Sequence, residues 1–254
     1  MTDLQNIQWK RIVVEAAAIV ISILLAFAID AWWEDHQRKS EEQVILASLY
    51  KEAQEIVSLI DETRIYTAGL RDATRRVYNV AAASESEVTD AEIDQFLVEL
   101  LWHINPSVTN APVLESIVGS GDLEVISSGE LRRQLGSVTV FLAALKDEII
   151  RDSDYYNSTF LPYIQTHAFL GQVYSLESRW PGFSERVYPP YDLVAVESNV
   201  SNREVFKSHK FQNLLLHRLT TTTNILEWYQ SDEDPQLKIL VKLIERELKI
   251  QTDG

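Results

Sequence analysis

Cysteine is absent from the 254-residue sequence, and the five histidines are scattered along it. The absence excludes disulfides, thiolate chemistry and most structural zinc sites. No two histidines are spaced four apart on one helix face, so no metal site is expected. Glycine-rich phosphate loops, serine-hydrolase elbows and dinucleotide fingerprints are also missing, and Gly119-Ser120-Gly121 is interpreted as a turn. The sequence therefore predicts a protein without a cofactor and without catalytic residues.

Glycine and proline are both scarce, with eight and seven residues, and no proline occurs before Pro106. A many-stranded sheet needs frequent turns, so this distribution favours long helices and an all-α fold. Basic residues are also few relative to acidic ones, and the formal net charge is −15. Such a surface repels phosphate backbones, which argues against extended nucleic-acid binding.

One long hydrophobic segment is present, at residues 12–33, after a short tail of residues 1–11. Its 22 residues would extend about 33 Å as a helix, enough to cross a bilayer. The segment is flanked by membrane-boundary residues, namely Lys10, Arg11, Trp32 and Trp33. Two alternatives are a signal peptide cleaved near Ala26-Phe27-Ala28 and a buried core helix. Glu15 inside the apolar region disfavours cleavage, so a transmembrane helix is the main prediction.

The predicted transmembrane helix has two different faces. At about 100° per residue, one face carries the small or polar residues Glu15, Ala18, Ser22, Ala26 and Asp30. Small residues let membrane helices approach closely, and carboxylates avoid lipid. We call these five residues the small-residue face and expect it to form a pore lining or a helix–helix interface. In the alternative interpretation, Glu15 and Asp30 lie at the two headgroup layers.

Helical patterns continue behind this segment. Residues 34–83 contain apolar positions three and four apart, as in a bundle or coiled coil, and predict a stalk helix. Residues 84–254 predict a helical domain, with capping boxes beginning at Thr89, Ser127 and Ser201. Pro112 and Asp234-Pro235 are typical of further helix starts. The proline-rich range 174–200 predicts an irregular loop.

Two stretches carry a family resemblance. They are residues 15–34, which end in Asp30-Ala-Trp32-Trp33-Glu34, and residues 114–131, with the core Leu114-Glu-Ser-Ile-Val-Gly-Ser-Gly121. With the closing helices from Phe211 to Leu248, they resemble a widespread bacterial family of single-pass membrane proteins described as a domain of unknown function. The resemblance implies a bacterial inner membrane location and a helical domain behind one span. It implies no established activity.

Some side chains in the predicted domain are candidates for ligand binding. Arg71, Arg75 and Arg76 share one helix side and could bind an anion, although pairing with nearby acids is the simpler interpretation. Seven aromatics could line a pocket but are expected in the core: Trp102, Tyr155, Tyr156, Phe160, Tyr163, Phe169 and Trp180. His103, His167, His209 and His217 are expected at the surface or the core edge.

These observations predict a membrane-anchored homo-oligomer that contacts the lipid bilayer and binds a small ligand or protein partner through its helical domain. If four or more spans meet, Glu15, Ser22 and Asp30 would form polar rings, and carboxylate rings select cations. The leading hypothesis is therefore an ion-conducting effector gated by the domain. The alternatives are a non-conducting scaffold or sensor and a tethered enzyme. Basic residues on the two sides of the span are nearly balanced, so the orientation stays open.

Overall fold

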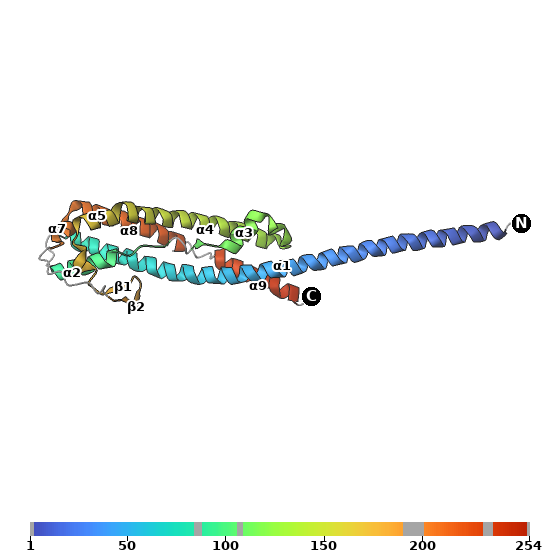
Figure 1. Cartoon of the computed structure of the whole chain (residues 1–254), viewed down its shortest axis with the longest axis horizontal. Helices are drawn as coiled ribbons and strands as arrows, with labels where there is room; N and C mark the ends of the chain where they lie inside the picture. Colours follow the sequence, from blue (N-terminus) through green and yellow to red (C-terminus); the bar gives the residue numbers. More distant parts are fainter. Residues whose placement is uncertain (1–2, 84–87, 106–108, 190–200, 231–235, 253–254) are drawn as a thin grey trace.

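The computed structural model describes residues 3–83, 88–105, 109–189, 201–230 and 236–252, and it is almost entirely helical. The 80-residue helix α1 (Asp3–Ala82) extends far beyond the rest of the chain at its N-terminal end (Figure 1). The domain adds two helices of moderate length, α2 (Asp90–Leu100) and α3 (Pro112–Ser120), and a 3₁₀ turn, η2 (Asp122–Val125). The predicted all-α class is confirmed.

Three columns of helix make up the domain; the first two run in the same direction and the third runs in the opposite direction (Figure 1). The first is the C-terminal half of α1. The second is α4 (Gly129–Tyr155), which continues through a π-helical turn, η3 (Tyr156–Phe160), into α5 (Leu161–His167). The third is α8 (His209–Gln230) followed by α9 (Gln236–Thr252), and both contact α1 and α4. The α8–α9 column thereby lies between the other two.

Several predicted helix boundaries are confirmed. The span segment and residues 34–82 form one uninterrupted helix. Thr89 caps α2 through a reciprocal capping box with Glu92, and Pro112 begins α3. Gly121 ends α3 with a φ of 87°, a left-handed conformation that glycine adopts without steric cost. Its neighbour Ser120 hydrogen-bonds Asp122, as expected for a turn.

Other expectations need correction. The long helix predicted for residues 34–83 is present, but it is not a stalk ahead of the domain, because from Glu42 onward one face of it is buried in the domain core. The cap of α4 is Ser128 and not Ser127, whose hydroxyl instead bonds Glu42. The range 174–200 includes an antiparallel hairpin, β1 (Ser178–Trp180) and β2 (Phe183–Tyr188). Ser201 does not cap a long helix, since α7 (Arg203–Lys207) ends before α8 begins. Asp234-Pro235 and residues 190–200 lie outside the described residues.

The core consists of two apolar clusters separated by a polar layer. The proximal cluster, which is nearer the exposed N-terminal part of α1, joins α1, α3, α4, α9 and the end of α8. The distal cluster joins the end of α1, α2, the short helix α6 (Leu170–Val173), η3, α5, α7 and the start of α8. Buried polar side chains from α1, α4 and α8 lie between them: Thr67, Thr74, Glu148, Asp152, Arg218 and Thr222. We call these six residues the polar layer.

The hairpin packs on α1 through two glycines. A Cβ atom added to Gly69 would lie 2.1 Å from the backbone nitrogen of Gly182, and one added to Gly182 would lie 2.4 Å from the carbonyl oxygen of Ile65. Gly182 also has a φ of 78°, which disfavours other residues. An ion pair between Arg186 and Glu62 adds a second contact. The backbone of the hairpin turn therefore lies directly against α1.

We predict opposite outcomes for two glycine-to-alanine substitutions inside helices. Gly136→Ala in α4 meets no atom within 4 Å, so it should stabilise the domain by about 0.5–1 kcal/mol through helix propensity. Gly69→Ala gains the same propensity in α1 but must displace the hairpin backbone, so it should destabilise the domain. Urea unfolding of both variants measures the difference. Equal stabilisation by both would contradict the close Gly69–Gly182 packing.

Candidate functional site

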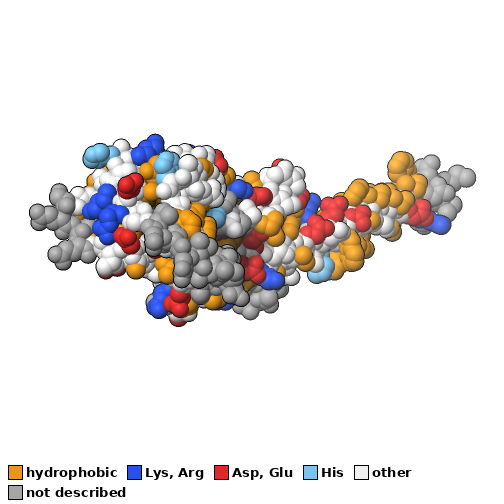
Figure 2. All heavy atoms as spheres, turned by 60° about the vertical axis from the view of Figure 1, so that its left-hand side comes forward, with side chains coloured by type: hydrophobic (Ala, Val, Ile, Leu, Met, Phe, Trp, Pro, Cys, Tyr) orange, Lys and Arg blue, Asp and Glu red, His pale blue; other side chains and the backbone are white. Residues whose placement is uncertain are grey.

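The N-terminal part of α1 exposes its apolar side chains completely. Every described side chain from Arg11 to Glu41 is exposed, and Glu42 is the first buried one. Figure 2 shows hydrophobic side chains covering this free helix. By length and composition the helix is able to cross a membrane, and none of its apolar window is buried within the chain. A core helix of this same domain would have been covered by its own neighbours.

The small-residue face contains local contacts only. The Ser22 hydroxyl donates to the carbonyl oxygen of Ala18 at 2.8 Å, and Arg11 pairs with Glu15 at 3.0 Å. Ala26 and Asp30 are exposed on the same face. Ser22 therefore satisfies its hydroxyl within its own helix, and that leaves its oxygen able to accept a hydrogen bond from a second helix.

A short polar segment separates the apolar region from the domain. Trp32 and Trp33 end the apolar region, and His36 stacks on Trp32 with ring centroids 5.7 Å apart. Residues 34–41 then form i,i+4 pairs, Glu34 with Arg38 and Asp35 with Lys39. These eight residues extend about 12 Å, comparable to one headgroup layer and its water boundary. The side chain of Lys10, the fourth predicted boundary residue, is not described.

Carboxylates on α1 fix the proximal end of the domain. Glu42 is 3 % exposed and accepts hydrogen bonds from the amide and the hydroxyl of Ser127. Glu52 accepts the amides of Val113 and Leu114 at 2.7 and 2.8 Å, which satisfies free N–H groups at the start of α3. Glu42 was not singled out from the sequence. Its position four residues before Leu46, which places both on the same side of the helix, is the signal that indicates it.

Arg218 is the centre of the polar layer, at 1 % exposure. Its guanidinium donates to the carbonyl oxygens of Leu100 and Trp102 and lies over the rings of Tyr156 and Phe160, 4.9 and 4.8 Å from their centroids. Burial lowers the pKa of Arg218, and nearby Asp152 opposes that shift. A cation at the C-terminal end of α2 also complements the helix dipole.

The chain leaving α2 is held by side chains at four consecutive carbonyls. Arg218 donates to the carbonyl oxygens of Leu100 and Trp102. The Tyr156 hydroxyl donates to the carbonyl oxygen of Leu101 at 2.6 Å, and the Tyr66 hydroxyl donates to that of His103 at 3.0 Å. Burial raises the pKa of Tyr156 to about 12, so this phenol stays protonated and remains a donor. The sequence analysis missed this network because its members come from α1, η3 and α8.

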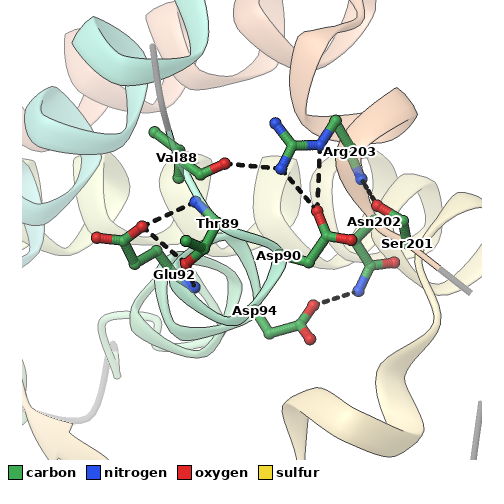
Figure 3. A network of polar contacts seen from close by, with 8 residues as sticks. All are labelled: Val88, Thr89, Asp90, Glu92, Asp94, Ser201, Asn202 and Arg203. Carbon is green, nitrogen blue, oxygen red and sulfur yellow. Dashed lines mark hydrogen bonds and ion pairs between the residues drawn. The ribbon is translucent and has the colours of Figure 1, made fainter. Parts of the chain in front are cut away.

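A second polar network closes the distal end (Figure 3). Arg203 donates to the Asp90 carboxylate at 2.8 Å and to the carbonyl oxygen of Val88 at 2.7 Å. Asn202 donates to Asp94 and accepts from the amide of Phe169, both at 2.7 Å. Hydrogen bonds from Ser201 and Arg203 lower the pKa of Asp90. These contacts attach the start of α7 to α2.

The predicted ligand residues are partnered within the domain. Arg71 and Arg75 both pair with Asp72, and Arg76 pairs with Glu99 at 2.9 Å. Anion binding by this group stays a prediction. Among the seven aromatics, Tyr156 and Phe160 are buried in the core, Trp102, Tyr155, Tyr163 and Phe169 are half-buried, and the Trp180 side chain is not described. The four histidines named above are exposed, as expected: His103, His167, His209 and His217.

Within the described residues, no group of three or more histidine, cysteine, aspartate or glutamate side chains is arranged to hold a metal ion. Comparison of the chain with protein-family models, with curated proteins and with solved structures gives no match. The resemblance to a bacterial family of single-pass membrane proteins is therefore still a prediction. Helix α1 is the element that bears most directly on function, because its first half is exposed and apolar and its second half lies in the domain core.

We predict that Arg218→Met lowers the free energy of unfolding by about 3 kcal/mol, because two buried carbonyls lose their donors and each unsatisfied group costs about 1–3 kcal/mol. Arg246→Met removes an exposed ion pair with Glu130 and should leave the free energy of unfolding nearly unchanged, because solvent screens the pair. Urea unfolding in detergent measures both. Unchanged stability of Arg218→Met would mean that desolvation of the guanidinium cancels its hydrogen bonds.

Proposed function

We propose that this protein is a single-pass membrane protein whose spans self-associate and whose helical domain is rigidly joined to its span. The observation that carries the proposal is the continuity of α1. One helix supplies both the exposed apolar segment and a column of the domain core. A rotation or shift of the domain would therefore be transmitted to the span without an intervening joint.

The dimensions of α1 support residence in a bilayer. Residues 12–33 extend about 33 Å, against a hydrocarbon thickness of about 30 Å. Two tryptophans mark the end of that segment, where interfacial aromatics are favoured. The polar residues 34–41 then pass the headgroup layer before Glu42 enters the domain. The first buried contact thus occurs just outside the membrane boundary.

The rotational phase of α1 supports association through the small-residue face. From Ala26 to Val44 the helix makes about five full turns, so both residues lie on the same side. Val44 is 66 % exposed, and Lys51 and Glu55 on that side are also exposed. The core residues of α1, such as Leu46, Ala53 and Ile60, lie on the opposite side. Two parallel copies could therefore contact each other along the small-residue face while their domains point away from the contact.

Ion conduction is the finer form of this proposal. It would need several spans around a lumen, with Glu15, Ser22 and Asp30 facing it. Arg11 pairs with Glu15 on this face, so a ring at that level would contain both charges rather than carboxylates alone. This pairing favours the scaffold or sensor over the cation channel. Conductance from purified protein in liposomes distinguishes the two.

The first prediction is that the intact chain, with its N-terminal residues retained, is recovered in the membrane fraction and is extracted by detergent but not by high salt or alkaline carbonate. The exposed segment of residues 12–33 is the physical reason, since its many apolar side chains are unfavourable in water. Mass spectrometry of the N-terminus provides the check. A soluble form beginning near Ile29 would show a cleaved signal peptide and would contradict the proposal.

The second prediction compares two identical substitutions on opposite faces of the span. Ala18→Leu places bulk on the small-residue face and should weaken self-association by about tenfold, whereas Ala17→Leu faces away and should have little effect. Cross-linking or single-molecule photobleaching of the full chain in bilayers measures association. A residual oligomer held by the domains is detected by repeating the comparison with the isolated span. Equal effects of both variants would show that the small-residue face is not the interface.

A further inference from the structure

A cavity of about 400 Å³ lies between α1, α2 and the hairpin, at the level of Thr67 and Thr74 of the polar layer. Gly69, Asp72 and Arg76 of α1 form one wall, and Gln95 and Glu99 of α2 form another. The hairpin closes it with Arg179, Pro181, Gly182 and Phe183. The volume is in the lower part of the range of small-molecule pockets. Since the cavity lies in the domain, its occupant is independent of the membrane proposal.

The charged residues that line the cavity are two of each sign, Arg76 and Arg179 against Asp72 and Glu99. Residues outside the lining also pair with two of them, since Arg71 and Arg75 contact Asp72 and Glu177 contacts Arg179. A purely anionic ligand would have to take Arg76 from Glu99 and leave that carboxylate without its cation. A purely cationic ligand would have to take Glu99 from Arg76 and leave that guanidinium without its carboxylate. A ligand with one charge of each sign compensates both residues, so it avoids this electrostatic cost.

The hairpin contributes the apolar side chains of the wall, and these are firmly positioned. Phe183 and Pro181 come from the hairpin, whose turn is held against Gly69 by backbone contact. Arg186 lies over the Phe183 ring, 4.4 Å from its centroid, and also pairs with Glu62 of α1. The apolar surface is thereby fixed beside the charged residues, and it provides a place for a small hydrophobic group.

We propose that this cavity binds a small zwitterion of the class of free amino acids with an apolar side chain. The ligand carboxylate lies toward Arg76 and Arg179, its ammonium group toward Asp72 and Glu99, and its side chain against Phe183 and Pro181. The ligand therefore connects α1 to both α2 and the hairpin. Because α1 continues into the exposed apolar segment, binding at this cavity stabilises one arrangement of that helix.

The test uses calorimetric titration of the full chain in detergent with L-leucine and with two analogues that each lack one charge. L-leucinamide lacks the carboxylate, and N-acetyl-L-leucine lacks the ammonium group. We expect leucine or another apolar amino acid to bind, and each analogue of it to bind about tenfold more weakly or worse. This comparison uses the unmodified protein, so it does not depend on the folding of a variant.

A matched pair of double variants locates the site. Arg76→Gln with Glu99→Gln removes the paired charges at the cavity and should weaken binding about tenfold. Arg246→Gln with Glu130→Gln removes a comparable exposed ion pair elsewhere and should leave binding unchanged. Binding of the two analogues as tight as leucine would show recognition of the apolar group alone and overturn the proposal. Absence of binding for all apolar amino acids up to about 10 mM would also overturn it.

Discussion

The guanidinium of Arg218 lies where the two halves of the domain meet, and much of the surrounding structure is arranged to satisfy it. The carbonyl oxygens of Leu100 and Trp102 accept hydrogen bonds from it, and it lies over the rings of Tyr156 and Phe160. A buried cation costs several kcal/mol unless such partners are present. Asp152, on α4, contributes the opposite charge in the same layer. The layer also fixes the axial register of α8 against α1 and α4, because a slip of one turn would bury these groups among apolar residues.

The polar layer divides the domain into two halves, which contact α1 through different residues. The proximal half is joined to α1 by Glu42, Glu52 and the hydrogen bond from Tyr50 to Glu245. The distal half is joined to α1 through α2 and through the hairpin, and it is closed by the Arg203–Asp90 contact. The proposed ligand cavity lies at the level of the polar layer, beside Gly69, Asp72 and Arg76 of α1. A change there would act on α1 between the two halves, and the continuous helix would carry it toward the exposed apolar segment.

The sequence predicted the elements whose information is local. The scarcity of glycine and proline predicted long helices, and the structure contains them. The apolar segment and the capping box at Thr89 depend only on neighbouring residues, and both form helix as predicted. It did not predict the hairpin, because prolines on both sides of residues 182–188 masked a short strand pattern. The polar layer was also missed. Arg218, Asp152 and Tyr66 lie far apart along the chain, and each alone is typical of an exposed or ordinary helix position.

The order of the helices along the chain has a consequence for biosynthesis. The apolar face of α1 is covered chiefly by α8 and α9, which follow it by more than a hundred residues. During translation, α1 leaves the ribosome long before these partners are synthesised. Until then the leucine and isoleucine side chains in its C-terminal half are uncovered. The N-terminal segment can enter a bilayer during this interval. Insertion would then come before closure of the domain, and a nascent chain interrupted before α8 would remain anchored but open to chaperones and proteases.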